Sequence, residues 1–62
     1  MFELVDDAGN VLNVVDLPDV LLACEWFFQG KDYTLISATA DEATVLSEGR
    51  RWLVRRTASQ DR

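Results

Sequence analysis

The residues best suited to chemistry lie in an arginine-rich segment near the end of the chain. Arg50, Arg51, Arg55 and Arg56 surround Trp52. Guanidinium groups bind phosphates and aromatic rings stack on bases, so this composition is typical of an anion-binding or nucleic-acid-binding site. On a β-strand, Arg51 and Arg55 would project to one side and Trp52 to the other. That alternation predicts that Trp52 belongs to the core.

The composition excludes most nucleophilic and metal chemistry. Histidine is absent and Cys24 is the single cysteine, so the chain cannot build a Ser–His or Cys–His pair, a four-ligand zinc site or an internal disulfide. Cys24 follows Ala23 and precedes Glu25. Apolar burial and a neighbouring negative charge both disfavour the thiolate, so we expect a buried, unreactive thiol.

Two groups of acidic residues remain as candidates for catalysis or for cation binding. Asp41 and Glu42 are adjacent, as paired carboxylates for acid–base chemistry would be. Asp6, Asp7 and Asn10 carry oxygen ligands for Ca²⁺ or Mg²⁺, but their spacing is not that of a calcium-binding loop, and a turn explains them equally well. We therefore predict no catalytic residue, no metal site, no cofactor and no enzymatic activity.

The overall composition predicts one small folded domain over residues 1–56. Of the 62 residues, 48% are hydrophobic and 27% are charged, which separates the chain from disordered sequences. Residues 57–62 are polar and without periodicity, so we expect a frayed tail. The first residues do not resemble a signal peptide, and no apolar run approaches the ~18 residues of a membrane span, so a cytoplasmic location is expected.

The first of three glycine-containing turns is predicted at Asp6–Gly9. Asp at the first position and Gly at the fourth favour a type I turn followed by a glycine bulge. This turn pairs Asp6 with Asn10 and Val5 with Val11. Regular pairing beyond that point would place on one face the apolar residues Phe2, Leu4, Leu12 and Val14.

The second turn leaves two interpretations open for residues 17–29. A type II′ turn at Gln29–Asp32 would pair strands 24–28 and 33–37, and the aromatic run Trp26–Phe28 favours this hairpin. The alternative is a helix over residues 17–29, capped by Asp16 and closed by Gly30. Helical spacing supports this alternative at Leu17, Val20, Leu21, Cys24, Phe27 and Phe28.

The third turn is predicted at Ser47–Arg50. Counting outward from it pairs Leu46 with Arg51, then Val45 with Trp52, and ends with Glu42 opposite Arg55. Ala43, Val45, Trp52 and Val54 would share one face of this hairpin.

Together these turns predict an all-β fold, a six-strand meander of three hairpins curled into a small barrel or a sandwich. In general shape this resembles an SH3-like barrel, and the resemblance is architectural only. If residues 17–29 are helical, the fold is instead α+β, in the order ββαβββ, with the helix packed on one sheet.

The surplus of apolar side chains suggests a function in protein association. A chain of this length buries only about 60% of its unfolded surface, so a partner chain is one means of stabilising it. We therefore expect a non-enzymatic interaction module or regulator that forms a homo-oligomer or docks on another protein, without membrane contact. The candidate contact residues are those on the second face of the hairpins, Val5, Val11, Phe27, Ile36, Leu46 and Leu53.

Two alternatives follow from the distribution of charge. Residues 1–49 hold ten acidic residues against Lys31 alone, a balance of −9, whereas residues 50–62 have a balance of +4. The basic segment predicts nucleic-acid binding through Arg50, Arg51, Arg55 and Arg56, although the net charge of −5 opposes approach to a polyanion. The acidic majority suggests a small inhibitor of the type that phages and mobile elements carry.

Overall fold

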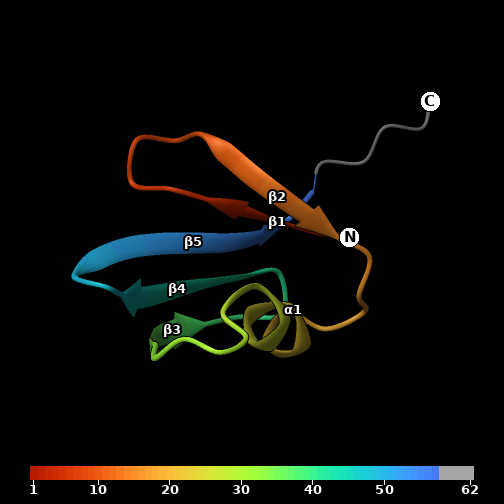
Figure 1. Ribbon diagram of the computed structural model, residues 1–62. Helices are drawn as coiled ribbons and strands as arrows, with labels where there is room; N and C mark the ends of the chain where they lie inside the picture. Colours follow the sequence, from red (N-terminus) through yellow and green to blue (C-terminus); the bar gives the residue numbers. More distant parts are fainter. Residues whose placement is uncertain (58–62) are drawn as a thin grey trace.

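One antiparallel sheet and one short helix make up the computed structural model, which describes residues 1–57 (Figure 1). The elements, in chain order, are β1 (Phe2–Val5), β2 (Val11–Val15), α1 (Val20–Phe27), β3 (Thr34–Ala38), β4 (Glu42–Ser47) and β5 (Arg50–Arg56). The strand order is β2-β1-β5-β4-β3, so β1 and β5 from the two ends of the chain lie together in the middle. Apart from Thr57, whose N–H donates to the Met1 carbonyl, the predicted tail lies outside the described residues.

The helix corrects the leading prediction for the middle of the chain. Residues 24–28 do not form a strand of a second hairpin, because α1 occupies Val20–Phe27. The element order is the ββαβββ of the alternative interpretation. The meander of six strands is therefore wrong at this point, and the sheet is open between the edge strands β2 and β3, so a barrel is not confirmed.

Asp19 starts the helix, three residues later than the cap expected at Asp16. Asp19 has an extended backbone (φ −131°), and its Oδ1 accepts from the Leu21 N–H at 3.4 Å. At the other end the Phe28 N–H donates to the Cys24 carbonyl, and Gly30 adopts φ +79°. Gly30 follows the cap residue Phe28 by two positions, in a turn closed by the Lys31 N–H and the Phe28 carbonyl at 2.9 Å, so the chain leaves the helix near the glycine predicted to close it.

The β4–β5 hairpin has the register predicted from its turn. The pairs run from Ser47–Arg50 to Glu42–Arg55 without a shift. Glu48 and Gly49 both have positive φ, 57° and 74°, as a two-residue turn of type I′ requires. Because this turn matches the twist of the strands, the local sequence is enough to set the whole hairpin.

The β1–β2 hairpin follows its predicted turn but departs from the predicted register. Asp6 and Asn10 are hydrogen bonded through Asp6 N–H and Asn10 carbonyl at 3.0 Å, and Val5 pairs with Val11. A bulge then shifts the pairing by one residue, so Leu4 lies opposite Asn13. The expected apolar face of Phe2, Leu4, Leu12 and Val14 is therefore wrong, because Val14 pairs with Glu3 and Val15 with Phe2.

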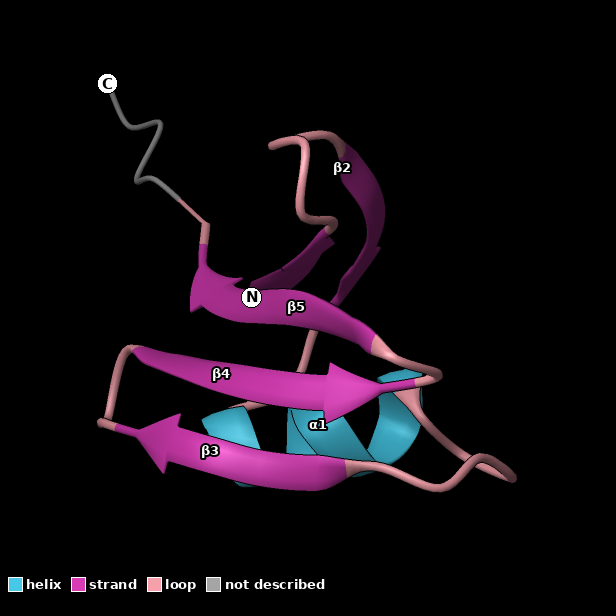
Figure 2. Ribbon diagram, turned by 90° about the vertical axis from the view of Figure 1, so that its left-hand side faces the viewer, coloured by secondary structure: helices cyan, strands magenta, loops and turns pink. Residues whose placement is uncertain are grey.

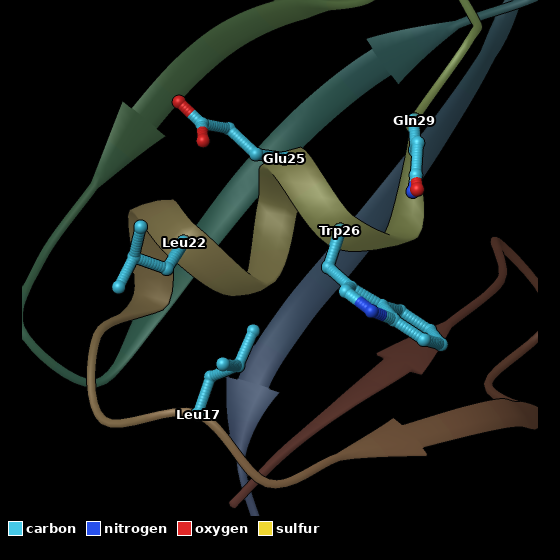
Figure 3. Close-up of a pocket in the computed structure, with 5 residues that line it drawn as sticks. All are labelled: Leu17, Leu22, Glu25, Trp26 and Gln29. Atoms are coloured by element: carbon cyan, nitrogen blue, oxygen red, sulfur yellow. The ribbon is translucent and has the colours of Figure 1, made fainter.

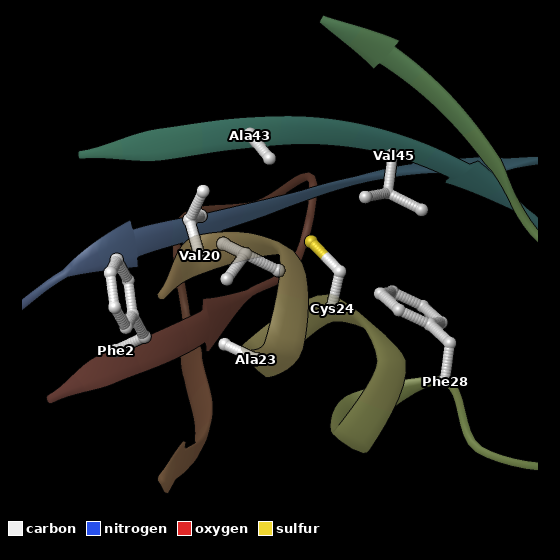
Figure 4. Packing of buried hydrophobic residues seen from close by; sticks show 8 residues of the cluster. Phe2, Val20, Ala23, Cys24, Phe28, Ala43 and Val45 are labelled. Carbon is white, nitrogen blue, oxygen red and sulfur yellow. The ribbon is translucent and has the colours of Figure 1, made fainter. Parts of the chain in front are cut away.

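The core lies between α1 and one face of the sheet. Val20 and Cys24 point from the helix toward β4 (Figure 4). Small side chains on both sides, Ala23 and Ala43, allow helix and sheet to approach closely. The buried cluster consists of Phe2, Val20, Ala23, Cys24, Phe28, Ala43, Val45 and Val54.

Within residues 1–57, no helix lies on the second face of the sheet. Figure 2 shows α1 behind β3 and β4, with the uncovered side of these strands toward the viewer. We call this side the open face. Trp52 and Val54 of β5 pack with the core on the helix side, so the alternating residues Arg51, Leu53 and Arg55 project to the open face.

Replacing the helix cap tests this assignment. We expect Asp19→Ala to lower the free energy of unfolding by about 1 kcal/mol, because it removes the acceptor for the Leu21 N–H. Asp16→Ala is the matched control and should change it by less than about 0.5 kcal/mol. Urea denaturation followed by far-UV circular dichroism measures both variants, and a larger loss for Asp16→Ala would contradict the assignment.

Acidification tests the first turn. Oδ1 of Asp6 accepts the backbone N–H of Asn10 at 2.8 Å and of Ala8 at 3.0 Å. The hydrogen bond from the Asn10 backbone, opposed in part by desolvation, lowers the pKa of Asp6 below its ordinary 3.8. This contribution is thus present above pH ~4 and is lost as the pH falls through the lower folded-state value.

We therefore expect Asp6→Asn to show a smaller drop in its urea midpoint than the parent protein between about pH 5 and pH 2.5. Asp7→Asn, in the same exposed turn, is the control and should follow the parent. Equal pH dependence in all three proteins would show that Asp6 does not act in this way.

Candidate interaction surface

The open face presents an apolar row across four strands. The register places Thr44, Leu53, Val5 and Val11 side by side, from β4 through β5 and β1 to β2. Val11 is 49% exposed, whereas Val5 is buried although no helix covers it. Leu53 and Val11 flank Val5 in the row, so the row is continuous rather than a set of isolated side chains.

Polar or mixed rows flank this apolar row on both sides. On one side Glu42, Arg55 and Glu3 lie opposite one another on β4, β5 and β1, followed by Val14 on β2. Arg55 donates from Nε to Oε2 of Glu3 and forms an ion pair with it. On the other side Leu46 lies opposite Arg51. The open face thus has an apolar centre with charges at both ends.

Four of the six predicted contact residues come together on this face, namely Val5, Val11, Leu46 and Leu53. Phe27 does not join them. It was assigned to a strand, and the structure places it in α1, half-buried against the core on the other side of the sheet. Ile36 lies at the irregularity of the edge strand β3 and is exposed. Val14 also lies on the open face, although it was not predicted as a contact residue. Nothing in residues 11–15 indicates the bulge that places Val14 there.

The four arginines of β5 do not form one basic patch. Arg56 lies over the Phe2 ring and pairs with Asp41 at 3.0 Å, on the helix side, and the Arg50 guanidinium lies 6.0 Å from the Trp52 ring centre. Arg51 and Arg55 project to the opposite side. Two of the four charges are therefore already opposed by carboxylates.

Trp52 is engaged in the core rather than available for base stacking. Its Nε1–H donates to the Ser47 carbonyl at 3.1 Å, and its ring packs edge-on against Phe28 at 6.2 Å. Nucleic-acid binding through this strand remains a prediction, but it would rest on phosphate contacts without aromatic stacking.

A second apolar surface lies on the outer side of α1. An open depression of about 410 Å³ is lined by Leu17, Leu22, Glu25, Trp26 and Gln29. Figure 3 shows Leu17 and Trp26 lining it from the loop and the helix, with the Glu25 carboxylate pointing away from them. Trp26 is 48% exposed. The sequence does not predict this surface, because the aromatic run Trp26–Phe28 favours a strand for residues 24–28 over the helical spacing.

The titratable side chains of the candidate chemical groups have structural roles. Asp6 and Asp19 accept backbone N–H groups at a turn and at the helix start, and Asp41 pairs with Arg56. Cys24 is buried in the core, where desolvation, assisted by the charge of Asp19, raises the pKa of its thiol. These contacts hold the first turn, the start of the helix and the end of β5 in place.

Within residues 1–57, no group of three or more His, Cys, Asp or Glu side chains is placed to hold a metal ion. No helix in the same range has both the length and the apolar character to cross a bilayer. No protein-family model, curated protein or solved structure matches the chain.

The buried thiol gives a direct test of the helix–sheet contact. We expect Cys24 to react with a maleimide at least about a hundredfold more slowly in the native protein than in urea, because labelling requires opening of the core. Mass spectrometry over a time course measures both rates. Comparable rates would place Cys24 at the surface and would contradict the described packing.

Proposed function

We propose that the protein is a non-enzymatic interaction module that binds another protein chain through its open face. The observation that carries the proposal is the uncovered sheet. Val11, Val14 and Leu46 remain exposed there, and they continue into the half-buried Leu53. Contiguous apolar surface bordered by charge is typical of protein-binding sites.

The composition of the face supports a protein partner. Its apolar centre would lose contact with water on binding, at about 25 cal/mol for each Å² buried. The charges at its ends would stay at the rim, where exposed ion pairs affect specificity and association rate more than affinity. The predominance of β-branched and leucine side chains also provides a rigid surface, because little rotamer freedom remains to be lost.

The positions of the reactive groups support a role without catalysis. The thiol is buried in the core, and three of the carboxylates are bound to backbone N–H groups or to arginine. The depression beside Trp26 is open to solvent, whereas catalysis benefits from a site that excludes water. These features agree with a module whose function is binding.

Site-specific photo-crosslinking tests the proposal. A benzophenone amino acid at position 46 samples the open face, and the same residue at position 40 samples the exposed turn at the opposite end of β4. We expect discrete protein adducts in cells and with the purified protein from position 46 but not from position 40. The masses of the adducts show whether the partner is another protein or a second copy.

Addition of Leu53→Thr to the position 46 variant provides the specificity control. Loss of the adduct in this variant, with unchanged circular dichroism, would support binding through the apolar row. Absence of any adduct from position 46, or equal adducts from positions 46 and 40, would refute a function of the open face in binding.

A further inference from the structure

We propose that the partner on the open face is a second copy of this chain, stacked sheet on sheet about a two-fold axis. The axis runs along the strands between β4 and β5. This inference rests on the proposed function, because it assigns the occupant of the same surface. It is carried by the arrangement of charges and apolar residues in the rows of the open face.

The charged row is complementary to itself. Across β4, β5 and β1 its charges alternate, with Glu42 negative, Arg55 positive and Glu3 negative. A two-fold axis between β4 and β5 places β4 over β5 of the other copy while keeping each row over the same row. Glu42 then faces the partner's Arg55, and Arg55 faces the partner's Glu42. Each contact forms twice, as an isologous interface requires.

The apolar residues match under the same operation. In the central row, Leu53 of each copy lies over Thr44 of the other copy, and the two leucines flank the axis. In the remaining row, Leu46 lies over the partner's Arg51, whose aliphatic stem packs on leucine while its guanidinium group reaches solvent. Apolar contacts therefore occupy the middle and charges the two ends, which is the usual organisation of an interface.

Most of the acidic residues lie away from this contact, so the net charge of −5 does not block it. Asp16, Asp19 and Glu25 are on or beside the helix, and Asp6, Asp7 and Glu48 are in turns. At physiological salt, charges more than about 8 Å apart are largely screened. Repulsion between the acidic surfaces of two stacked copies is therefore weak compared with the local contacts.

Edge-to-edge pairing through β2 is the main competing mode of self-association, because β2 is an uncharged and exposed edge strand. Asn13 opposes this mode. Its side-chain Oδ1 accepts the N–H of Val14 at 2.9 Å, so that a backbone donor is already satisfied. Stacking of the open faces leaves the edges unchanged and covers Leu53, Thr44 and Leu46, which edge pairing would leave in water.

Sedimentation equilibrium of the full chain tests the proposal with a matched pair of variants. Leu46 and Leu22 are equally exposed, at 44% and 45%, but they lie on opposite sides of the molecule. We expect the parent protein and Leu22→Arg to form dimers in the micromolar range. Leu46→Arg should weaken dimerisation at least about tenfold, because it places a second guanidinium group over the partner's Arg51.

Leu46→Arg is expected to fold, because position 46 is exposed and lies beside the turn that sets the register of the hairpin. Circular dichroism checks this. A second pair of variants tests the two-fold axis. Glu42→Arg should also weaken the dimer about tenfold, since it would face the partner's Arg55, whereas Glu48→Arg makes the same change of charge in a turn and should have no effect.

A parent protein that stays monomeric up to about 1 mM would overturn the second copy as partner. A photo-adduct of position 46 with a different protein would in that case leave the proposed function intact. A dimer that survives both Leu46→Arg and Glu42→Arg would also overturn the inference, and loss of the dimer in Leu22→Arg would assign the interface to the helix side instead.

Discussion

The contact between one eight-residue helix and a five-stranded sheet determines the remainder of the structure. A helix with its side chains is about 10 Å wide, whereas five strands at about 4.8 Å spacing extend over roughly 19 Å. One helix can therefore cover only part of one face. Val20, Ala23 and Cys24 fill that contact. The cysteine, the helix cap and the aromatic residues around Trp52 all serve it, and the apolar residues of the other face are left for a partner.

How far the sequence predicts the fold depends on how local each feature is. The β4–β5 register follows from two turn residues, Glu48 and Gly49, and was predicted in full. The β1–β2 turn was also predicted, but the bulge beyond it has no signal in the local sequence. The helix was predicted only as the alternative, because the strand preference of Trp26–Phe28 competed with the helical spacing. In the structure the segment is helical, and Val20 and Cys24 are buried against the sheet.

The candidate surface was predictable to the extent that strands alternate. Val5, Val11, Leu46 and Leu53 were selected from three different strands and the structure puts them on one face. Phe27 was selected by the same rule and lies elsewhere, because its segment is helical. The continuity of the apolar row depends on the pairing of β1 with β5, strands about fifty residues apart in the chain, and such a contact cannot be derived from neighbouring residues.

The central claim is that α1 covers one face of the sheet and that the open face binds a partner. Residue-resolved NMR spectra recorded over a dilution series test this claim most directly. We predict that the amide resonances of the open face, including those of Thr44, Leu46 and Leu53, shift with concentration, while those of Leu22 and Trp26 on the helix stay constant. Shifts confined to α1, with an unchanged open face, would contradict the claim and would place the binding surface on the helix.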